Sequence, residues 1–298
     1  MYVGGGSSPP SGTHLMKTDY NLKEAYNKAI QFTRSHYENF PVISFLIPKN
    51  LYHHIAIIYW FARTADDIAD EGIDLPFEKI ERLNKFESRL TGLLNEEYES
   101  DLEFALSNTI RIKNLSKENF YNLLSAFKQD VTVKRYKSFS DLNDYCQRSA
   151  NPVGRLILEL YSIENTEALI FSDKICTGLQ ITNFLQDISI DYEKGRIYIP
   201  SEDLSEFGID ESYFENKIID EKFSNLMEFQ IQRTEKLFKE GEKLLQFLHG
   251  RLKYEIKWTI LGGREILKLI RLNKYDVYYR KFKLTKKNFI FLLIKSFL

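Results

Sequence analysis

The sequence predicts an all-α protein, on three observations. Glycine and proline, which interrupt helices, number only 14 and 7 among 298 residues, well below their usual combined share of roughly 12%. Valine, isoleucine and threonine do not alternate with polar residues over any long stretch, as they would in half-buried strands. From Asn21 onward, apolar residues recur with helical spacing. We therefore expect long helices packed around a core, without a sheet.

Turn signals divide the chain into helix-sized segments. In order, they stand at Pro41, Pro48, residues 72–76, Asn151-Pro152, Gly195 and Gly262-Gly263. The segments between them leave room for helices of about three to seven turns. Because no repeat or low-complexity linker follows the first residues, residues 17–298 are expected to form a single domain. Residues 1–16 are rich in glycine, serine and proline, and we expect a disordered leader there rather than a secretory signal.

The composition limits the kinds of function. Hydrophobic residues make up 43% of the chain and charged residues 28%, enough for a packed core beneath a solvated surface. Lysine and arginine number 41 against 42 acidic residues, so the basic excess typical of nucleic-acid binding is missing and no nucleic-acid partner is expected. Two cysteines, Cys146 and Cys176, are too few for a disulfide framework or a cysteine-rich zinc site. We expect buried thiols in a reducing, cytoplasmic compartment.

The last twenty residues combine basic and apolar side chains. Five basic residues stand between Arg280 and Lys287, and the apolar run from Phe289 to Ile294 follows. The apolar runs of this chain are much shorter than the roughly 18 residues that a membrane-spanning helix needs. The mixture is typical of peripheral contact with a membrane, here the inner membrane. The alternative is that this segment packs against the helical body.

An acidic cluster follows an apolar stretch in the first third of the chain. After Arg63 come Asp66 and Asp70, four residues apart, so both carboxylates project from one face of a helix. Like charges at this spacing repel each other, and more strongly where solvent is excluded. A compensating partner is therefore expected. The alternative interpretation is an acidic face in contact with water.

A second series of polar residues favours the interpretation in which a bound partner compensates the carboxylate charges. Polar residues at intervals of three, four and four share one helix face: Gln180, Asn183, Asp187 and Asp191. If this helix opposes the first, four aspartates converge, and each carboxylate pair about 6 Å apart repels by about 3 kcal/mol at an effective dielectric near 20. Mg²⁺ relieves such repulsion, taking one or two carboxylates per ion together with waters and phosphates. The two clusters predict a diphosphate bridged by Mg²⁺, with Arg63 and Arg196 as direct partners.

Between the clusters lies Asp130, followed by a helical pattern that contains a proline. Pro152 removes a backbone donor and is expected to kink the helix, while Gly154 allows close approach of a ligand or a neighbouring helix. An apolar cavity wall is expected here, formed by Tyr145, Ala150, Val153, Gly154 and Ile157. The alternative is a kinked core helix that binds no ligand.

Together these motifs resemble those of the squalene/phytoene synthase family, the head-to-head trans-prenyltransferases of the all-α isoprenoid synthase fold. The resemblance covers about residues 35–280. Residues 63–71 resemble the family's first aspartate-rich motif, and residues 179–191, followed by 195–200, resemble the second. Residues 145–154 resemble its central segment. The resemblance implies a prenyl diphosphate substrate bound in a central active-site cavity.

The resemblance also implies a role for each site residue. The Mg²⁺ ligands would be Asp66, Asp70, Asn183, Asp187 and Asp191. The substrate diphosphate would contact Arg63, Arg196 and Gln180. The catalytic tyrosines would be Tyr59, Tyr145 and Tyr198, and Phe40 would join the cavity wall.

Three departures from the family pattern resemble the bacterial hydroxysqualene synthase branch of hopanoid biosynthesis. Gln186 stands where phytoene and squalene synthases usually have arginine, Asn151-Pro152 replaces a Gly-Thr pair, and residues 36–41 replace a small hydroxyl residue. That branch ionises presqualene diphosphate and captures the rearranged cation with water, using Mg²⁺ and no nicotinamide. Hydroxysqualene formation is therefore the expected activity.

Two alternatives stay open. The first is condensation of two farnesyl or geranylgeranyl diphosphates to presqualene diphosphate, squalene or phytoene, which Gln186 disfavours. The second is a non-catalytic helical scaffold, against which the intact aspartates of both motifs argue.

Overall fold

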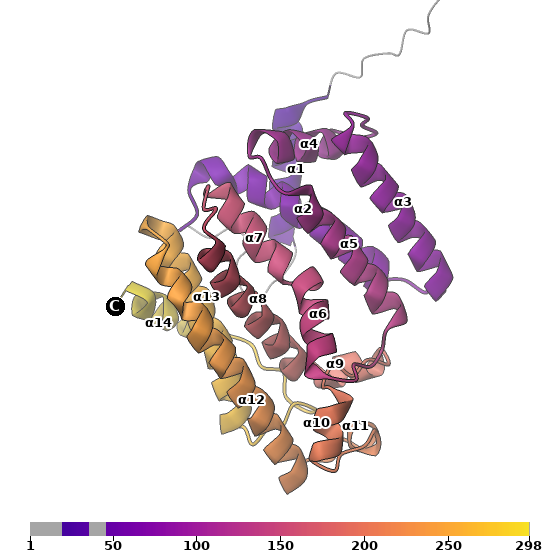
Figure 1. Cartoon of the computed structure of the whole chain (residues 1–298), viewed down its shortest axis with the longest axis vertical. Coiled ribbons are helices and arrows are strands. Elements are labelled where there is room, and N and C mark those ends of the chain that lie inside the picture. Colours follow the sequence, from indigo (N-terminus) through magenta and orange to yellow (C-terminus); the bar gives the residue numbers. More distant parts are fainter. Residues whose placement is uncertain (1–19, 36–45, 298) are drawn as a thin grey trace, which may run out of the picture.

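The structure is a computed structural model of the whole chain and describes residues 20–35 and 46–297. All regular secondary structure in these residues is helical (Figure 1), which confirms the all-α prediction. The α-helices are α1 (Leu22–Ser35), α2 (Tyr52–Asp70), α3 (Pro76–Leu94), α4 (Asp101–Ile112), α5 (Lys117–Thr132), α6 (Phe139–Ser149), α7 (Asn151–Leu160), α8 (Thr166–Gln186), α9 (Ile188–Glu193), α10 (Ser201–Glu206), α11 (Ser212–Glu215), α12 (Glu221–Gly241), α13 (Gly250–Leu272) and α14 (Lys286–Phe297). Two short 3-10 helices, η1 (Lys49–Leu51) and η2 (Glu242–Gln246), lie before α2 and α13. The leader expected at residues 1–16 and the expected cavity residue Phe40 lie outside the described residues.

Two hydrophobic clusters form the core. Helices α1 to α5 and α7 build the first, in which Phe61 and Phe120 are fully buried. Helices α6 and α8 to α14 build the second, which buries Phe223 and Phe238. Ile157 of α7 packs against both clusters. Figure 1 shows the arrangement, with α6 and α7 between the N-terminal helices and the layer of α8, α12 and α13.

The central segment is broken into two helices rather than kinked. Helix α6 ends at Ser149 and α7 begins at Asn151, with Ala150 between them at φ −114° and ψ −46°. Pro152 lies in the first turn of α7, where its missing N–H leaves no helical hydrogen bond unmade. The buried side chain of Asn151 accepts a hydrogen bond from Thr177 Oγ1 at 3.0 Å, which ties the start of α7 to α8.

The helix expected through residues 180–191 is also divided. Helix α8 ends at Gln186 and α9 begins at Ile188, with Asp187 at the junction. Two backbone hydrogen bonds of 2.9 Å, from the Asp187 amide to the Asn183 carbonyl and from the Asp191 amide to the Asp187 carbonyl, continue the helical path. Asp187 and Asp191 therefore stay one turn apart, as their spacing predicted.

A short extended pairing follows α9. Gly195 has a φ of +74°, a left-handed conformation that glycine adopts without strain, and here the chain turns away from α9. The Ile197 amide then donates to the Lys134 carbonyl at 3.0 Å, and an isolated parallel bridge joins Ile197 to Arg135. This pairing places the residues after Gly195 beside the end of α5.

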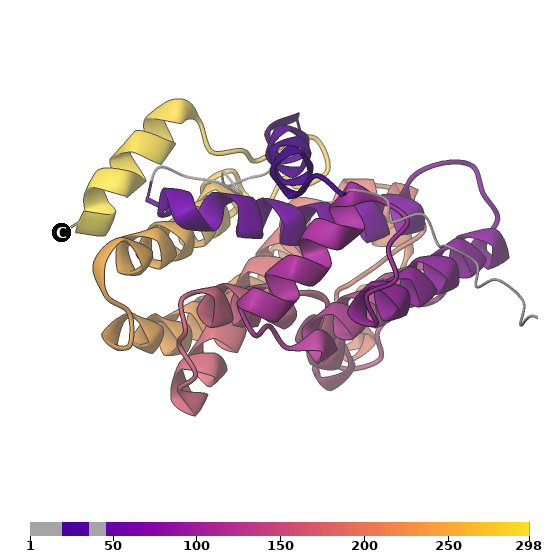
Figure 2. The same ribbon diagram turned by 90° about the horizontal axis from the view of Figure 1, so that it is seen from above.

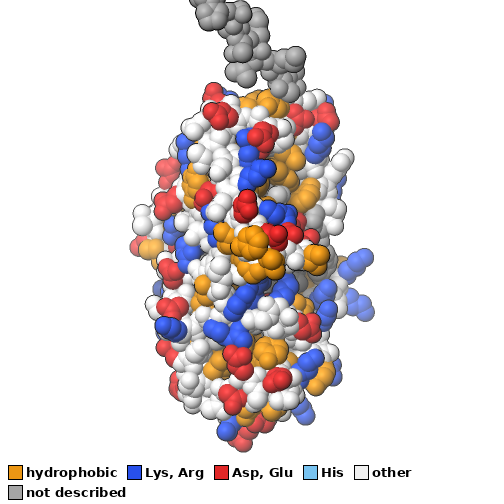
Figure 3. Space-filling view, turned by 90° about the vertical axis from the view of Figure 1, so that its right-hand side faces the viewer, with side chains coloured by type: hydrophobic (Ala, Val, Ile, Leu, Met, Phe, Trp, Pro, Cys, Tyr) orange, Lys and Arg blue, Asp and Glu red, His pale blue; other side chains and the backbone are white. Residues whose placement is uncertain are grey.

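The surface combines both signs of charge. Acidic and basic side chains are interspersed on the face in Figure 3, as expected for a net charge of −1. Figure 2 shows α14 as an outer helix beside α13. None of the helices in the described ranges combines the length and the apolar character required to cross a bilayer.

Candidate active site

Asp130, in the last turn of α5, is a buried carboxylate that joins several elements of the site. The residue is 7% exposed. Its Oδ2 accepts the Tyr145 hydroxyl of α6 at 2.7 Å, and its Oδ1 accepts the Tyr198 hydroxyl at 3.1 Å. Burial raises the pKa of Asp130 to about 6, although these two hydrogen bonds oppose the rise. Its backbone carbonyl accepts from Arg196 Nη2 at 3.2 Å.

Aromatic rings surround this carboxylate. The Tyr198 ring stacks on Phe184 of α8 with centroids 3.7 Å apart and planes at 7°. Tyr136 stacks on Tyr198 at 5.7 Å, and the Tyr145 ring lies 6.0 Å from Tyr198. Ring faces attract cations, most strongly where water is excluded. The wall can therefore stabilise a positive charge that develops beside it.

The first acidic cluster lies in the last turns of α2. Arg63 Nε lies 2.7 Å from Asp67 Oδ1, and Arg63 Nη1 lies 3.2 Å from Asp66 Oδ2. Burial, and after it the charge of Asp70, raises the pKa of Asp66 to about 7. Arg63 thus already offsets acidic charge on its own helix, so a diphosphate there would compete with these carboxylates.

Asp70 connects the two clusters. Its Oδ1 accepts from Arg196 Nη2 at 2.7 Å and its Oδ2 from Lys194 Nζ at 2.6 Å. Burial alone would raise the pKa of Asp70, but these two hydrogen bonds lower it below its usual value. Both cations follow α9, so the end of α2 faces the loop after the second cluster.

The second cluster lacks comparable neutralisation. Burial, and after it the charge of Asp187, raises the pKa of Asp191 to about 7. Burial likewise raises the pKa of Asp187, against a hydrogen bond from Gln186 and the charges of Lys281 and Lys283. Charged carboxylates at these positions are held at a cost that a bound cation would remove.

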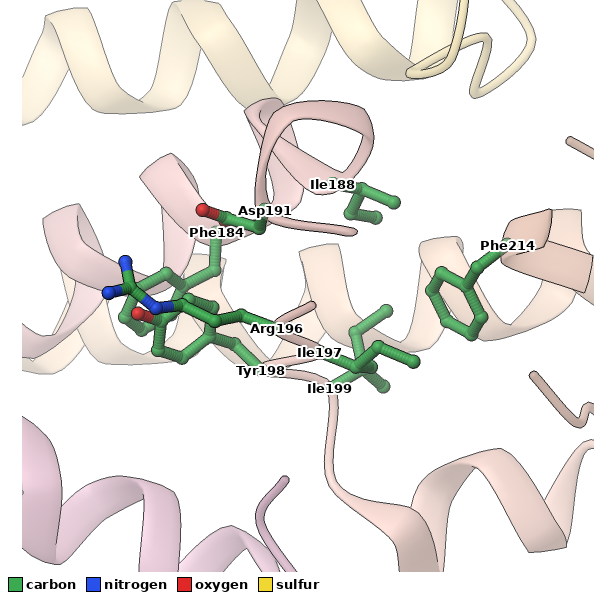
Figure 4. Close-up of a pocket in the computed structure, with 8 residues that line it drawn as sticks. All are labelled: Phe184, Ile188, Asp191, Arg196, Ile197, Tyr198, Ile199 and Phe214. Atoms are coloured by element: carbon green, nitrogen blue, oxygen red, sulfur yellow. The ribbon is translucent and has the colours of Figure 1, made fainter. Parts of the chain in front are cut away.

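A small pocket of about 10 Å³ lies beside this cluster, room for about one water molecule. Its lining residues are Phe184, Ile188, Asp191, Arg196, Ile197, Tyr198, Ile199 and Phe214. Figure 4 shows the Asp191 carboxylate and the Arg196 guanidinium pointing toward the same side, next to the rings of Phe184 and Tyr198, with Ile188, Ile197, Ile199 and Phe214 at the other end. Nε of Arg196 is buried and finds no acceptor among the described residues. A phosphate oxygen would supply one.

The donor set fits Mg²⁺. The side chains available are carboxylates, the hard oxygen ligands that Mg²⁺ prefers, and Asp66, Asp187 and Asp191 are short of positive charge. In residues 20–35 and 46–297, no group of three or more acidic, histidine or cysteine side chains is placed to hold a metal ion by itself. An open arrangement suits ions that are shared between one or two carboxylates and substrate phosphates.

Three further predicted residues lie on the helices that carry the clusters. Tyr59 is half-buried on α2, one turn before Arg63, and its ring lies 6.3 Å from that of Phe32 on α1. On α8, Gln180 is half-buried and Asn183 is exposed. Their predicted roles toward diphosphate and Mg²⁺ stay predictions.

The residues expected to form the cavity wall lie in different environments. Ala150 is buried at the junction of α6 and α7, Ile157 is half-buried between the two core clusters, and Val153 is 45% exposed. Gly154 faces α8, where a Cβ would lie 2.5 Å from Cys176 Sγ. Of the two neighbours expected for Gly154, a ligand or a helix, the structure shows the helix.

Comparison with known proteins identifies the family. The squalene/phytoene synthase family matches residues 33–288. The chain belongs to the squalene/phytoene synthase family. It is an enzyme of this family, and its helices form the isoprenoid synthase fold.

Individual relatives differ in coverage. The 15-cis-phytoene synthase of Synechococcus elongatus is 29% identical over 273 residues, 88% of each chain. The hydroxysqualene synthase of Zymomonas mobilis is 39% identical over 174 residues, 57% of each chain. A crystal structure of squalene synthase HpnC from Alicyclobacillus acidocaldarius superposes with a TM-score of 0.80 at 34% identity, covering 86% of this chain and 96% of that one. The family resemblance is confirmed. Similarity over most of the chain is to phytoene synthases and to the squalene synthase structure, whereas similarity to the hydroxysqualene synthase covers 57% of the chain.

The structure brings into the site several residues that were not expected there from the sequence. Lys194 pairs with Asp70, Tyr136 and Phe184 flank Tyr198, and Asp130 was noted without a role. The one available signal was that Asp130 continues the three- and four-residue spacing of the apolar residues Leu123 and Ala126, which places a carboxylate on an apolar helix face. The other contacts depend on tertiary packing.

Proposed function

We propose that this enzyme catalyses Mg²⁺-dependent head-to-head prenyl transfer, joining two prenyl diphosphates. The observation that carries the proposal is the hydrogen bond between Arg196 and Asp70, which joins the first aspartate motif to the loop that follows the second. Carboxylates short of positive charge and a buried guanidinium with an unused donor suit a diphosphate accompanied by Mg²⁺.

In this proposal the polar residues bind the leaving group. Arg196 Nε would donate to a diphosphate oxygen, and Asp66, Asp187 and Asp191 would hold Mg²⁺ through their carboxylate oxygens. Mg²⁺, when bound, would neutralise the negative charge that develops on the diphosphate as its bond to carbon breaks. The double bond of the second prenyl chain attacks the allylic cation, a carbon–carbon bond forms, and the released diphosphate accepts the proton that is lost.

The aromatic wall would protect the cation. The stacked rings of Phe184 and Tyr198 exclude water and offer their faces to positive charge. Asp130 accepts the hydroxyl protons of Tyr145 and Tyr198. Both phenol groups therefore use their protons in hydrogen bonds to Asp130, and the lone pairs of their oxygens stay available to the cavity. This arrangement favours stabilisation of a cation over protonation of the substrate.

A second candidate is the ionisation of presqualene diphosphate and its capture by water to give hydroxysqualene, without a nicotinamide. Two observations favour it: Gln186 in place of an arginine, and the 39% identity to a hydroxysqualene synthase over 174 residues. Both candidates use the same diphosphate site, so they differ in the substrate admitted and in how the cation is quenched.

The proposal includes a cytoplasmic enzyme in peripheral contact with the inner membrane. Cys146 and Cys176 are free thiols, which suits a reducing compartment. Products with about 30 carbons are nearly insoluble in water, so contact with a bilayer would help to collect or release them.

The test is to incubate the purified protein with Mg²⁺ and, separately, farnesyl, geranylgeranyl or presqualene diphosphate, each with and without NADPH, and to identify the products. Head-to-head transfer predicts a product of twice the carbon number from farnesyl or geranylgeranyl diphosphate. Turnover of presqualene diphosphate alone, with ¹⁸O from labelled water in the alcohol, would select the second candidate. No turnover of any of the three substrates would contradict both.

A pair of aspartate variants controls this experiment. Asp187→Asn should remove activity because Asp187 belongs to the proposed site. Asp173→Asn, also associated with α8, alters an aspartate that pairs with Arg155 at 2.6 Å and should leave activity near its original level. Equal losses in both variants would point to a general effect on α8.

A further inference from the structure

Helix α14 packs against α13 through one face only. Leu292 and Ser296 on that face are 2% and 0% exposed. The Phe289 ring meets Trp258 of α13 edge-on at 5.7 Å, and the Phe297 ring lies 4.6 Å from Tyr254. Membrane contact and packing against the helical body were the two alternatives for this segment. The structure shows packing for one face of α14.

The opposite face exposes large apolar side chains. Their exposed fractions are 60% for Ile290, 64% for Phe291 and 59% for Ile294. Phe297, whose ring also contacts Tyr254 of α13, lies at the edge of this face and is 50% exposed. At 3.6 residues per turn these four positions fall within an arc of about 120°. A soluble monomer gains nothing by exposing a continuous apolar arc, and such a patch marks an interaction surface.

Basic residues accompany this arc. After Asp276 the chain contains six lysines and arginines and no acidic residue, although the whole chain has a net charge of −1. On α14 itself Lys286, Lys287 and Lys295 are exposed. By helical spacing, Lys286 and Lys295 flank the apolar arc and Lys287 lies within it. This pattern contrasts with the mixed charges on the face in Figure 3.

The geometry points to α14 as a docking surface for an anionic lipid bilayer, with the helix parallel to the membrane and Phe291 and Ile294 inserted among the acyl chains. A helix of 12 residues is too short to span a bilayer and long enough to lie in its interface. A second copy of the chain fits less well, because a symmetric contact would bring the lysines of both copies together. Anionic headgroups complement them instead.

The segment before α14 connects this surface to the aspartate site. Phe282 and Leu284 are buried in the core cluster that also contains Tyr145 and Tyr198. Between them, Lys283 is among the charges that act on Asp187. The segment that leads to the docking surface therefore alternates buried and exposed residues, and it passes close enough to Asp187 for the charges of Lys281 and Lys283 to act on that carboxylate. The inference extends the proposed membrane contact and does not depend on which prenyl diphosphate reacts.

Sedimentation of the purified full chain with lipid vesicles tests the inference without any substrate. The protein should bind vesicles of phosphatidylglycerol and phosphatidylcholine, bind pure phosphatidylcholine at least tenfold more weakly, and be released by high salt. Replacing Lys286, Lys287 and Lys295 by glutamine should weaken binding about fivefold for each lysine. Phe291→Asp/Ile294→Asp should abolish binding while the circular dichroism and the melting temperature stay unchanged, because both residues are exposed.

The control is Ile112→Asp/Ile170→Asp, which alters two other apolar residues that are 55% and 51% exposed on α4 and α8. It should bind vesicles like the original protein. Three results would overturn the inference: no binding of the original protein to anionic vesicles, unchanged binding of Phe291→Asp/Ile294→Asp, or a concentration-dependent dimer that this variant dissociates without any vesicle binding. None of these measurements requires activity, so failure of the docking surface and failure of the proposed reaction are distinguishable.

Discussion

Arg196 Nη2 donates to Asp70 Oδ1 at 2.7 Å, linking residues 126 positions apart in the sequence. Arg196 is 7% exposed and Asp70 is only partly accessible, so the pair is shielded from competing water. Lys194 reaches the other oxygen of the same carboxylate but is itself 44% exposed. The two cations therefore differ in what they contribute, and this difference can be measured.

Arg196→Gln should be much more damaging than Lys194→Gln. Removing one partner of a shielded ion pair leaves the other poorly compensated, so we expect Arg196→Gln to lower the free energy of unfolding by about 2 kcal/mol. Lys194→Gln should cost less than about 1 kcal/mol, as is usual for exposed pairs. Loss of a buried donor to the diphosphate should also reduce kcat/KM about 100-fold in Arg196→Gln. Urea unfolding and steady-state kinetics test both, and equal effects of the two substitutions would contradict the assignment.

Asp130→Asn should separate stability from activity. Burial raises the pKa of Asp130 to about 6 in the folded protein, against a value near 3.8 in the unfolded chain. Ionisation of Asp130 therefore destabilises the folded protein as the pH rises above 3.8, and this loss of stability reaches its full size above pH 6. Asparagine cannot ionise, so the free energy of unfolding of the variant should be higher by about 1 kcal/mol at pH 8, a net value that includes the loss of one tyrosine hydrogen bond. At pH 4 the free energy of unfolding should not increase. Activity should fall at least tenfold, because one of the two phenols loses its acceptor.

Tyr145→Phe is the matched control for that substitution. It removes the 2.7 Å hydrogen bond but leaves the buried carboxylate, so it should lower the free energy of unfolding at pH 8 by about 1–2 kcal/mol. Thermal unfolding of both variants across pH 4 to 8 measures the opposite signs. Destabilisation by Asp130→Asn at pH 8 comparable to that of Tyr145→Phe would refute this account of the buried carboxylate.

Asp66→Asn should weaken the joint binding of Mg²⁺ and diphosphate. In the original protein we expect a thermal shift when Mg²⁺ and inorganic pyrophosphate are present together and little shift with either alone, by mass action on the folded state. Asp66→Asn should lose most of this shift. Asp67→Asn provides the control, because Asp67 lies on the same helix, is not among the predicted ligands, and is closer to Arg63 (2.7 Å) than Asp66 is (3.2 Å). A full shift in Asp66→Asn, or an equal loss in Asp67→Asn, would remove Asp66 from the set of proposed ligands.

Local periodicity explains what could be predicted from the sequence. Asp66 and Asp70, like Asp187 and Asp191, are neighbours along one helical path, so their spacing alone predicted that each pair lies together. The contacts between Arg196 and Asp70 and between Tyr198 and Asp130 join residues 126 and 68 positions apart. They depend on how α2, α5 and the loop after α9 pack, and no residue pattern along the chain encodes that geometry.

The same limit applies to the central segment. Pro152 correctly indicated an interruption, but a proline in the first turn of a new helix and one inside a kinked helix give the same sequence pattern. Because α7 starts afresh at Asn151, the positions after it do not continue the register of α6. Val153 is consequently exposed, and Gly154 faces α8.

Gly154→Ala should destabilise the protein through the contact between α7 and α8. A Cβ at this position would lie 2.5 Å from both Cys176 Sγ and Ser172 Oγ, so these two side chains would have to rotate together or the helices would have to separate. We expect the free energy of unfolding to fall by about 1–3 kcal/mol, as in other overpacked cores. In a Ser172→Ala/Cys176→Ala background both obstructing atoms are absent, and the loss caused by Gly154→Ala should shrink to less than about 1 kcal/mol.

Gly92→Ala, on α3, is the control, since the nearest atom to its Cβ would be the Glu97 carbonyl oxygen at 3.6 Å, an ordinary contact distance. There alanine should stabilise the helix by up to about 1 kcal/mol. Chemical unfolding and steady-state kinetics of the two alanine variants then distinguish the two neighbours first expected for Gly154. Lower stability with kcat preserved at temperatures below unfolding indicates helix packing. Unchanged stability with a large loss of kcat would instead mean that the added methyl group meets the substrate, and that Gly154 belongs to the cavity wall.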